Sequence, residues 1–466
     1  MLGRTRRVHF VGIGGIGMSG IAELLVNLGY SVTGSDLRLS EITDRLASLG
    51  VGVSVGHHAD HLGDADVVVV SSAVASDNPE VVAARARHVP VIPRAEMLAE
   101  LMRLRAGIAI AGAHGKTTTT SMVAWMLERA GLDPTAVIGG RLSAFGSNAR
   151  LGRGQYMVAE ADESDRSFLK LSPTIAVLTN IDREHMETYG TFDVLVDAFA
   201  DFAGRVPFYG AVVACVDDGP VAALLPRLMR RIVTYGFSPA ADVRGLDPVT
   251  DGRSGRCGVR YEVRGVPGGT GTGTLTLGVP GRHNLQNALG AIAVGLEVGV
   301  PFDRITAALA EFRGAERRYQ IRGDVNGVTV VDDYGHHPTE IAAVLRAARD
   351  GKPARIVAVF QPHRYSRTRD LIDDFGPALA LADEVVLLDI YPAGEPVIPG
   401  VSLETLAASV RTSVTGLHLA RDLDDAAAAV GRIARRGDVV VTLGAGSIAA
   451  LPDRILGVLG AQEVRP

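Results

Sequence analysis

The strongest chemical signal in the sequence is a glycine turn that leads into a lysine and a run of threonines. The segment Gly112-Ala113-His114-Gly115-Lys116-Thr117 follows an apolar run and opens a stretch typical of a helix. Backbone amides at such a turn bind phosphate, a lysine reaches the β and γ oxygens, and a threonine hydroxyl ligates Mg²⁺. The chain has only three lysines, so a turn that merely joins strand to helix is the weaker interpretation of Lys116.

Acidic residues follow the next apolar segment, YMVAE. They are Glu160, Asp162, Glu163 and Asp165. Ligands of a parallel α/β sheet lie at the carboxyl ends of its strands, and Mg²⁺ prefers oxygen ligands. We therefore expect one carboxylate of this group, Glu160 first, to complete a magnesium site with Thr117. The later segment TNIDREHMETYG adds Asn180 and His185 after another strand, although its spacing alone favours a structural, hydrogen-bonded role for that histidine.

Two polar residues in GRHNLQNALGA, His283 and Asn287, stand four positions apart and therefore share one face of a predicted helix. An amide can pair with an adenine edge, and an imidazole can lie against its ring. A capped helix start without a ligand explains the same spacing.

Arginines, histidines and aspartates gather in three segments of the last third of the chain. They are Arg317, Arg318, Asp332, Asp333, His336, His337, His363, Arg364 and Arg367. Guanidinium groups bind phosphate and carboxylate with two parallel hydrogen bonds. Each cluster alone is equally consistent with a solvated surface, but beside a nucleotide site the three predict the far wall of a cleft.

A second glycine turn near the N-terminus has the spacing Gly12-x-Gly14-x-x-Gly17, with Asp36 at the end of the next strand-like run. This pattern is typical of dinucleotide-binding folds, so an NAD-dependent oxidoreductase is one hypothesis. A pyrophosphate bound at a helix N-terminus does not reveal what is attached to it.

Alternating apolar strands and helical segments must position these residues. A length of 466 residues suggests about three domains. We expect an α/β fold with three of them: a Rossmann-like domain at 1–104, a central P-loop domain with a parallel sheet at 105–313, and a Rossmann-like α/β domain at 314–466. Two alternating runs, CGVRYEV and GTLTLGV, are predicted to join the central sheet as antiparallel strands.

Composition excludes several functional classes. Charged residues make up 21% of the chain and the formal net charge is −5, which argues against general nucleic-acid binding. No apolar run or leader-like start predicts a membrane or secreted protein, so we expect a cytoplasmic enzyme, monomeric or weakly dimeric. Cys215 and Cys257 have no partners at metal-binding spacing, and neither a disulfide nor a zinc site is expected.

Taken in order, the motifs resemble the Mur ligases of peptidoglycan synthesis over nearly the whole chain. The matching segments are HFVGIGGIGMSGIAE, SDNPE, AGAHGKTTTT, AEADESD, TNIDREHMETYG, GRHNLQNALGA, VVDDYGHHPTE and QPHRYSRTRDL. The last two are the most specific, and the set is closest to the branch that adds L-alanine. The resemblance implies a UDP-sugar on the first domain, ATP on the second and the amino acid on the third.

The resemblance also implies an activity and the residues that carry it. ATP would phosphorylate the lactyl carboxylate of UDP-N-acetylmuramate, and the amine of L-alanine would displace phosphate from the acyl phosphate. The implied catalytic residues are Lys116, Arg318, His336, Arg364 and Arg367. The implied ligands of ATP are Gly112, Ala113, His114, Gly115, Lys116, Thr117, Thr118, Asn180, His283 and Asn287. The implied ligands of Mg²⁺ are Thr117, Glu160 and His185. The implied ligands of the other substrates are Gly14, Gly15, Gly17, Asp36, Ser71, Arg317, His336, His363, Arg364 and Arg367.

Two departures from the family pattern affect these expectations. Ala113 stands where the family commonly has threonine, which removes one hydroxyl near the phosphates. Sister ligases carry a carbamylated lysine about 15 residues after the motif histidine, whereas no lysine lies between Lys170 and Lys352 here. That absence agrees with alanine addition and disfavours the later-step ligases.

Three alternatives remain at this level. A ligase that recycles a tripeptide onto UDP-N-acetylmuramate would share most motifs, although its first glycine turn usually differs. An NAD-dependent oxidoreductase would leave Lys116, Glu160 and the arginines without a role. A non-catalytic nucleotide sensor would have the glycine loop but lack a set of side chains able to bind the catalytic metal ion.

Overall fold

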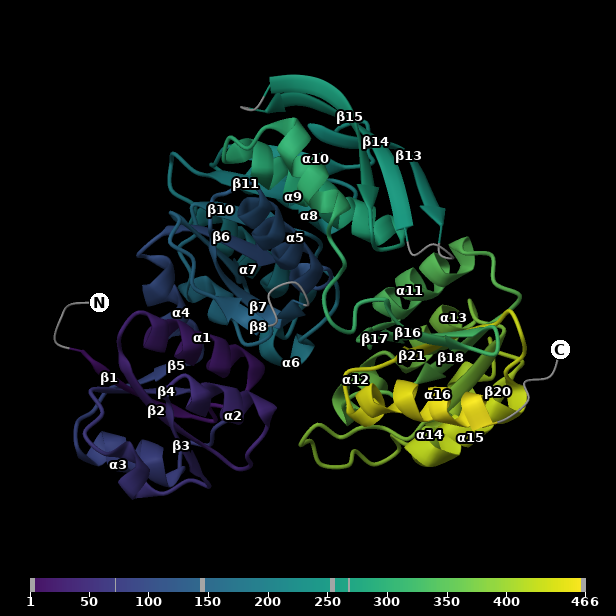
Figure 1. Ribbon diagram of the computed structural model, residues 1–466, viewed down its shortest axis with the longest axis horizontal. Coiled ribbons are helices and arrows are strands. Elements are labelled where there is room, and N and C mark those ends of the chain that lie inside the picture. Colours follow the sequence, from purple (N-terminus) through teal and green to yellow (C-terminus); the bar gives the residue numbers. More distant parts are fainter. Residues whose placement is uncertain (1–4, 72, 143–146, 252–255, 267–268, 462–466) are drawn as a thin grey trace. The chain divides into compact units, whose positions relative to one another are not determined.

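Three open sheets, each covered by helices, organise the described part of the chain (Figure 1). The computed structural model describes residues 5–71, 73–142, 147–251, 256–266 and 269–461. The three-domain α/β architecture expected from the sequence is confirmed. Within the described ranges, no helix has both the length and the apolar character needed to cross a membrane.

The N-terminal sheet has the strand order β3-β2-β1-β4-β5, and each of its neighbouring pairs is parallel. Short apolar strands such as VVVV are buried on both faces, which is why they lack the alternation of a half-exposed sheet. The elements are β1 (Arg7–Val11), α1 (Ile16–Asn27), β2 (Ser31–Asp36), α2 (Glu41–Ser48), β3 (Gly52–Val55), η1 (Ala59–Leu62), β4 (Val67–Val70), α3 (Pro79–Ala86), β5 (Val91–Pro93) and α4 (Arg94–Met102).

The central sheet has the order β15-β14-β13-β12-β11-β10-β6-β9-β7-β8. Its first half contains β6 (Ala106–Ala111), α5 (Lys116–Arg129), β7 (Thr135–Leu142), β8 (Ser147–Arg150), β9 (Tyr156–Glu160), η2 (Ser167–Lys170), β10 (Ile175–Leu178), α6 (Met186–Tyr189) and α7 (Phe192–Gly204). Its second half contains β11 (Ala211–Cys215), α8 (Gly219–Leu224), η3 (Leu225–Arg227), β12 (Ile232–Gly236), β13 (Val243–Asp251), β14 (Arg256–Val266), β15 (Gly269–Leu277), α9 (Arg282–Glu297) and α10 (Phe302–Ala310).

The C-terminal sheet has the order β16-β17-β21-β18-β19-β20, in which only the β16–β17 pair is antiparallel among the described strands. The elements are β16 (Gln320–Val325), β17 (Val328–Asp333), α11 (Pro338–Asp350), β18 (Ile356–Phe360), α12 (Tyr365–Asp370), α13 (Ile372–Leu379), β19 (Glu384–Leu388), α14 (Leu403–Val410), β20 (Leu417–Ala420), α15 (Leu423–Ile433), β21 (Val439–Leu443), η4 (Ser447–Ala450) and α16 (Leu451–Ala461).

Two compact units divide the chain. One comprises Met1–Leu246, Arg260–Leu275 and Gln286–Phe312, and the other comprises Asp247–Val259, Thr276–Leu285 and Arg313–Pro466. The N-terminal and central sheets therefore belong to the first unit, except for parts of β13, β14, β15 and α9, and the C-terminal sheet belongs to the second. The two runs expected to extend the central sheet do so as β14 and β15, beside a further strand, β13, that the sequence pattern did not predict.

Aromatic packing under α7 gives a test of the central core. The Phe202 side chain is fully buried and stacks on Phe168, with ring centroids 5.1 Å apart, whereas Phe208 on the following loop is 92% exposed. We expect Phe202→Ala to destabilise the central domain by about 3–5 kcal/mol, because it removes a buried ring and leaves a cavity. Phe208→Ala, the matched control, is expected to change stability by about 0.5 kcal/mol or less. Thermal unfolding followed by circular dichroism checks both, and equal Tm values for the two variants would contradict the prediction.

Candidate functional site

The turn between β6 and α5 has a shape that only glycine permits at both ends. Gly112 has φ +145° and Gly115 has φ +79°. A Cβ at Gly112 would overlap the Thr179 hydroxyl, and one at Gly115 would lie 2.7 Å from Oδ1 of Asn287. The turn is therefore held tightly against neighbouring side chains, as a phosphate cradle requires.

Side chains that follow β10 brace this turn. The amide of His114 donates to Oδ1 of Asn180 at 2.8 Å, and Nδ2 of Asn180 donates to the His114 carbonyl at 3.0 Å. The Thr179 hydroxyl donates to the same carbonyl at 2.7 Å. In this structure, Asn180 thus orders the loop backbone.

Lys116 lies inside the turn rather than in solvent. Its ammonium group donates to the carbonyls of Gly112 and Ala113 and to Oε1 of Glu163 at 2.7 Å. Burial raises the pKa of Glu163 to about 7 even though the lysine attracts its charge. The second oxygen of Glu163, Oε2, is buried and has no hydrogen-bond partner among the described residues.

Thr117 and Glu160 meet as predicted. The Thr117 hydroxyl donates to Oε1 of Glu160 at 3.0 Å, and the amide of Gly139 fixes the other carboxylate oxygen at 2.7 Å. A hydroxyl and a carboxylate at this separation form the kind of oxygen pair that holds Mg²⁺ together with phosphate oxygens and water.

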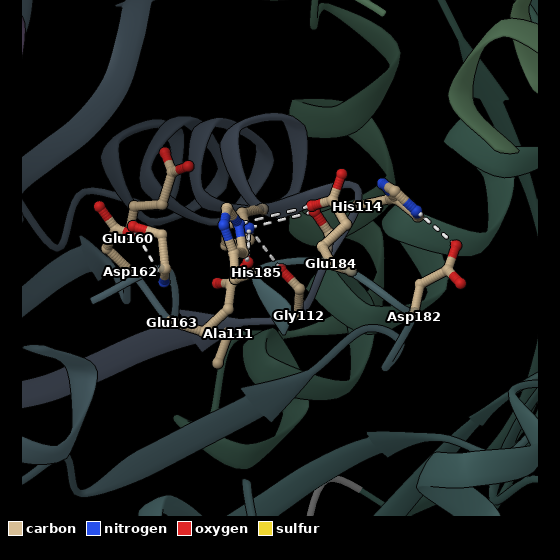
Figure 2. A network of polar contacts seen from close by, with 12 residues as sticks. Ala111, Gly112, His114, Glu160, Asp162, Glu163, Asp182, Glu184 and His185 are labelled. Atoms are coloured by element: carbon tan, nitrogen blue, oxygen red, sulfur yellow. Dashed lines mark hydrogen bonds and ion pairs between the residues drawn. The ribbon is translucent and has the colours of Figure 1, made fainter. Parts of the chain in front are cut away.

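His185 lies among acidic side chains beside the turn. Its Nε2 is 3.6 Å from Glu184 and 3.9 Å from Glu163, and the ligand atoms of these three residues lie within 4.8 Å of one another. Figure 2 shows Glu160, Asp162 and Glu163 gathered to one side of His185, with the hydrogen-bonded pair His114–Asp182 on the other. The histidine is thus part of the acidic centre, and Glu184, which the motif analysis did not select, is its neighbour.

Helix α9 carries both expected adenine ligands in its first turns. Asn287 contacts the turn at Gly115. His283 packs on Gly281, and burial together with the nearby Arg318 charge lowers the pKa of the histidine to about 4. Its imidazole is therefore neutral near pH 7.

The N-terminal glycine turn is fastened to the end of β2. The amides of Gly12 and Ile13 donate to the Ser35 carbonyl at 2.8 and 3.0 Å, and the amide of Gly14 donates to Oδ2 of Asp36 at 2.8 Å. The Ser71 hydroxyl lies beside Gly12. Asp36 therefore accepts a hydrogen bond from the turn itself. The position of Asp36 in the sequence is consistent both with this role and with ribose binding.

Arg94, which the sequence analysis did not select, lies against the same turn. A Cβ at Gly17 would overlap its guanidinium group, which also pairs with Asp162 of the central domain at 3.2 Å. Arg94 stands at the start of α4 without a motif around it, so only the tertiary structure identifies it as a cation beside the N-terminal glycine turn.

In the second unit, Arg317 and Arg318 lie over one aromatic ring. Their guanidinium carbons are 5.3 and 5.2 Å from the ring centre of Tyr334. Arg317 donates to Oδ2 of the buried Asp332 at 3.0 Å, whereas Arg318 is 3.5 Å from Glu340. Arg317 is thus anchored through Asp332.

The remaining predicted residues form a second cluster in that unit. The rings of His336 and His363 are 5.8 Å apart, and His363 stacks on Tyr391 at 5.6 Å. Arg367 reaches the His363 carbonyl at 3.4 Å, and Arg364 lies 3.7 Å from Glu395. Burial and the adjacent cationic groups lower the pKa of His363 to about 3, so this imidazole is neutral within a positively charged cluster.

Family models match successive parts of the chain. They are described as Mur ligase family, catalytic domain, for residues 7–106, Mur ligase middle domain for residues 110–295, and Mur ligase, glutamate ligase domain, for residues 317–446.

Known proteins match the chain over nearly its full length. A UDP-N-acetylmuramate–L-alanine ligase from Geobacter sp. (strain M21) is 54% identical over 453 residues, 96% of each chain. The solved structure of the UDP-N-acetylmuramate-alanine ligase of Thermotoga maritima has a TM-score of 0.80 and 30% identity, covering 97% of this chain and 98% of the other. The murein peptide ligase of Psychrobacter arcticus 273-4 has a TM-score of 0.72 and 26% identity, covering 98% and 99%.

The buried imidazole of His283 predicts a pH dependence of stability. Its pKa is about 4 in the folded chain against 6.5 for the free side chain, so the unfolded state binds the proton more readily. This contribution to stability is complete above pH 6.5 and is lost as the pH falls toward 4. We expect His283→Asn to flatten the Tm profile between pH 4 and 6.5, while the exposed control His88→Asn leaves it unchanged. Differential scanning calorimetry checks this, and parallel profiles for all three proteins would contradict it.

Proposed function

Because the chain belongs to the Mur ligase family, we propose that it joins L-alanine to the lactyl carboxylate of UDP-N-acetylmuramate at the expense of ATP. The observation that carries this proposal is the full-length likeness, at 54% identity, to an enzyme with that named activity. Tripeptide recycling is the second candidate, supported by the 26% identical murein peptide ligase. The higher identity favours alanine. Family membership replaces the oxidoreductase hypothesis for the N-terminal glycine turn.

In this proposal the central domain binds ATP. The amides of the turn from Gly112 to Gly115, with the N-terminus of α5 and Thr118, receive the phosphates, and Lys116 leaves Glu163 to contact the β and γ oxygens. The first turns of α9, with His283 and Asn287, receive adenine. Asn180 acts indirectly, since it fixes the backbone that forms the cradle.

Magnesium fits the oxygen pair of Thr117 and Glu160, and His185, which lies with Glu163 and Glu184, completes the metal sites in this proposal. The buried Oε2 of Glu163, which accepts no hydrogen bond from the described part of the chain, supports a cationic occupant nearby. When bound, Mg²⁺ neutralises charge on the transferred phosphoryl group.

The N-terminal domain binds the UDP moiety in this proposal. Gly14, Gly15 and Gly17 bring the N-terminus of α1 to the diphosphate, while Asp36 and Ser71 shape the turn around it. Arg94 adds a cation beside Gly17.

The chemistry has two steps with defined demands. The lactyl carboxylate attacks the γ-phosphorus of ATP, which forms the acyl phosphate and releases ADP. The neutral amine of alanine then attacks the acyl carbon, loses a proton, and the C–O bond to phosphate breaks. Both steps build negative charge on oxygen, so fixed cations that position the reactants supply most of the catalysis.

The C-terminal domain provides such cations. Arg318 is assigned to the transferred phosphoryl group. Arg364 and Arg367, with His336 and His363, are assigned to the carboxylates of muramate and alanine, whereas Arg317 braces the site through Asp332. The domains 1–104, 105–313 and 314–466 thus bind UDP-sugar, ATP and amino acid respectively.

Amine dependence of ADP release tests the proposal directly. The purified protein is mixed with ATP, Mg²⁺ and UDP-N-acetylmuramate, and L-alanine, glycine, L-serine or the recycling tripeptide is added in separate reactions. We expect turnover with L-alanine and a product of the UDP-muramoyl-alanine mass by mass spectrometry. Preference for the tripeptide would support recycling, and absence of turnover with every amine would reject the ligase function.

Substitution of Lys116 separates a ligase from a nucleotide sensor. We expect Lys116→Ala to lower kcat by about 10³-fold or more, because the cation that contacts the phosphates is lost, while the Kd for UDP-N-acetylmuramate stays within about twofold. Lys170→Ala removes a half-exposed lysine 3.5 Å from Glu96 and serves as the control with unchanged turnover. Turnover by the Lys116 variant equal to that of this control would contradict the assigned role.

A further inference from the structure

A carboxylate of the N-terminal domain is completely buried although no proposed step uses it. Glu80, in the first turn of α3, belongs to the SDNPE segment and has no exposed surface. Its Oε2 accepts a hydrogen bond from the Ser35 hydroxyl at 2.6 Å and lies 3.4 Å from Nε2 of His9. Its Oε1 accepts from Nδ1 of His61 at 2.9 Å and from the His58 amide at 3.2 Å.

These donors keep the carboxylate ionised. Burial alone would raise the pKa of Glu80, but hydrogen bonds from the surrounding imidazoles and hydroxyl outweigh burial and lower it to about 2. A third histidine, His57, contacts the same group, with its Nδ1 3.7 Å from Oε2 of Glu80 and 2.9 Å from the Ser35 hydroxyl. A buried negative charge held by this many donors fixes their positions strongly.

Ser35 connects this charge to the N-terminal glycine turn. Its hydroxyl donates to Glu80, and its carbonyl accepts the amides of Gly12 and Ile13. The next residue, Asp36, accepts the amide of Gly14. The amides of Gly12, Ile13 and Gly14 therefore donate to the end of β2. The first amides of a helix have no acceptor within it, so the N-terminus of α1 can bind an anion.

We propose that Glu80 is a positioning residue for the diphosphate of the nucleotide sugar: it anchors Ser35, Ser35 fixes the glycine turn, and the turn aims the N-terminus of α1. This inference rests on the proposed function, since it takes UDP-N-acetylmuramate as the ligand. Glu80 itself touches no substrate. Its effect is expected on binding of the UDP-sugar and not on binding of ATP.

Isothermal titration at 15 °C with UDP-N-acetylmuramate, and separately with a non-hydrolysable ATP analogue, tests the proposal on the full chain. Glu80→Gln keeps the size of the side chain but removes its charge. It also replaces one acceptor oxygen with an NH₂ group that faces the hydrogen-bond donors of Ser35, His58 and His61. We expect its Kd for UDP-N-acetylmuramate to rise about tenfold, with the Kd for the ATP analogue unchanged. Ser35→Ala removes the connecting hydroxyl and is expected to weaken the same binding. The double variant should show less than the product of the two effects, because both interrupt one connection.

Asp66→Asn is the matched control. Asp66 accepts the amides of Arg6 and Arg7 at the start of β1, the opposite end of the strand that leads into the turn. We expect this variant to lower Tm without changing the Kd for UDP-N-acetylmuramate. A purely structural role for Glu80 would give the same pattern in Glu80→Gln, a lower Tm with unaltered Kd, and would overturn the proposal.

Two further outcomes are decisive. If Glu80→Gln does not fold, unaltered binding by Ser35→Ala overturns the proposal and weakened binding supports it. If the unmodified chain binds no UDP-N-acetylmuramate, the proposed function fails and this inference with it, a result distinct from normal binding by the variants.

Discussion

The candidate site depends on the parallel register of three adjacent strands, β9, β6 and β10. Ile110 of β6 pairs with Glu160 of β9, and Ala111 pairs with Leu178 of β10. This register brings the acidic segment after β9 and the Thr179–Asn180 segment after β10 to the two sides of the turn after β6. A shift of one residue would turn these side chains to the opposite face of the sheet. The cradle, its braces and its metal ligands therefore follow from one pairing pattern.

A buried ion pair holds the side chain of Lys116 inside the turn after β6. Lys116 and Glu163 form an ion pair in which both side chains are largely shielded from water. Removing one partner of such a pair is costly, so each holds the other in place. Glu163 also belongs to the acidic centre that includes Glu184 and His185.

The two glycine turns of the first unit use their backbone amides differently. The turn after β6 is braced by side chains of the neighbouring strand end, Thr179 and Asn180. The turn after β1 is braced by Ser35 and Asp36, and behind them by the buried Glu80. The glycine spacing of each turn predicts phosphate binding but not these braces, and it does not reveal the identity of the ligand.

The sequence by itself determined the local features. Apolar runs and helix periodicity predicted the three α/β domains. The motifs predicted a glycine turn between β6 and α5 and the proximity of Thr117 and Glu160. Strands without a continuous apolar run, such as β13 and the antiparallel β16, were missed because their pairing partners, not their own residues, define them. The tertiary structure alone identified Arg94, Glu184 and Glu80 as members of sites. No spacing along the chain points to their roles, since the side-chain partners of Glu80 are 19 to 71 positions away. Such contacts arise only when strand order and register bring distant segments together, because side-chain electrostatics depend on distance in space and burial rather than on position along the chain.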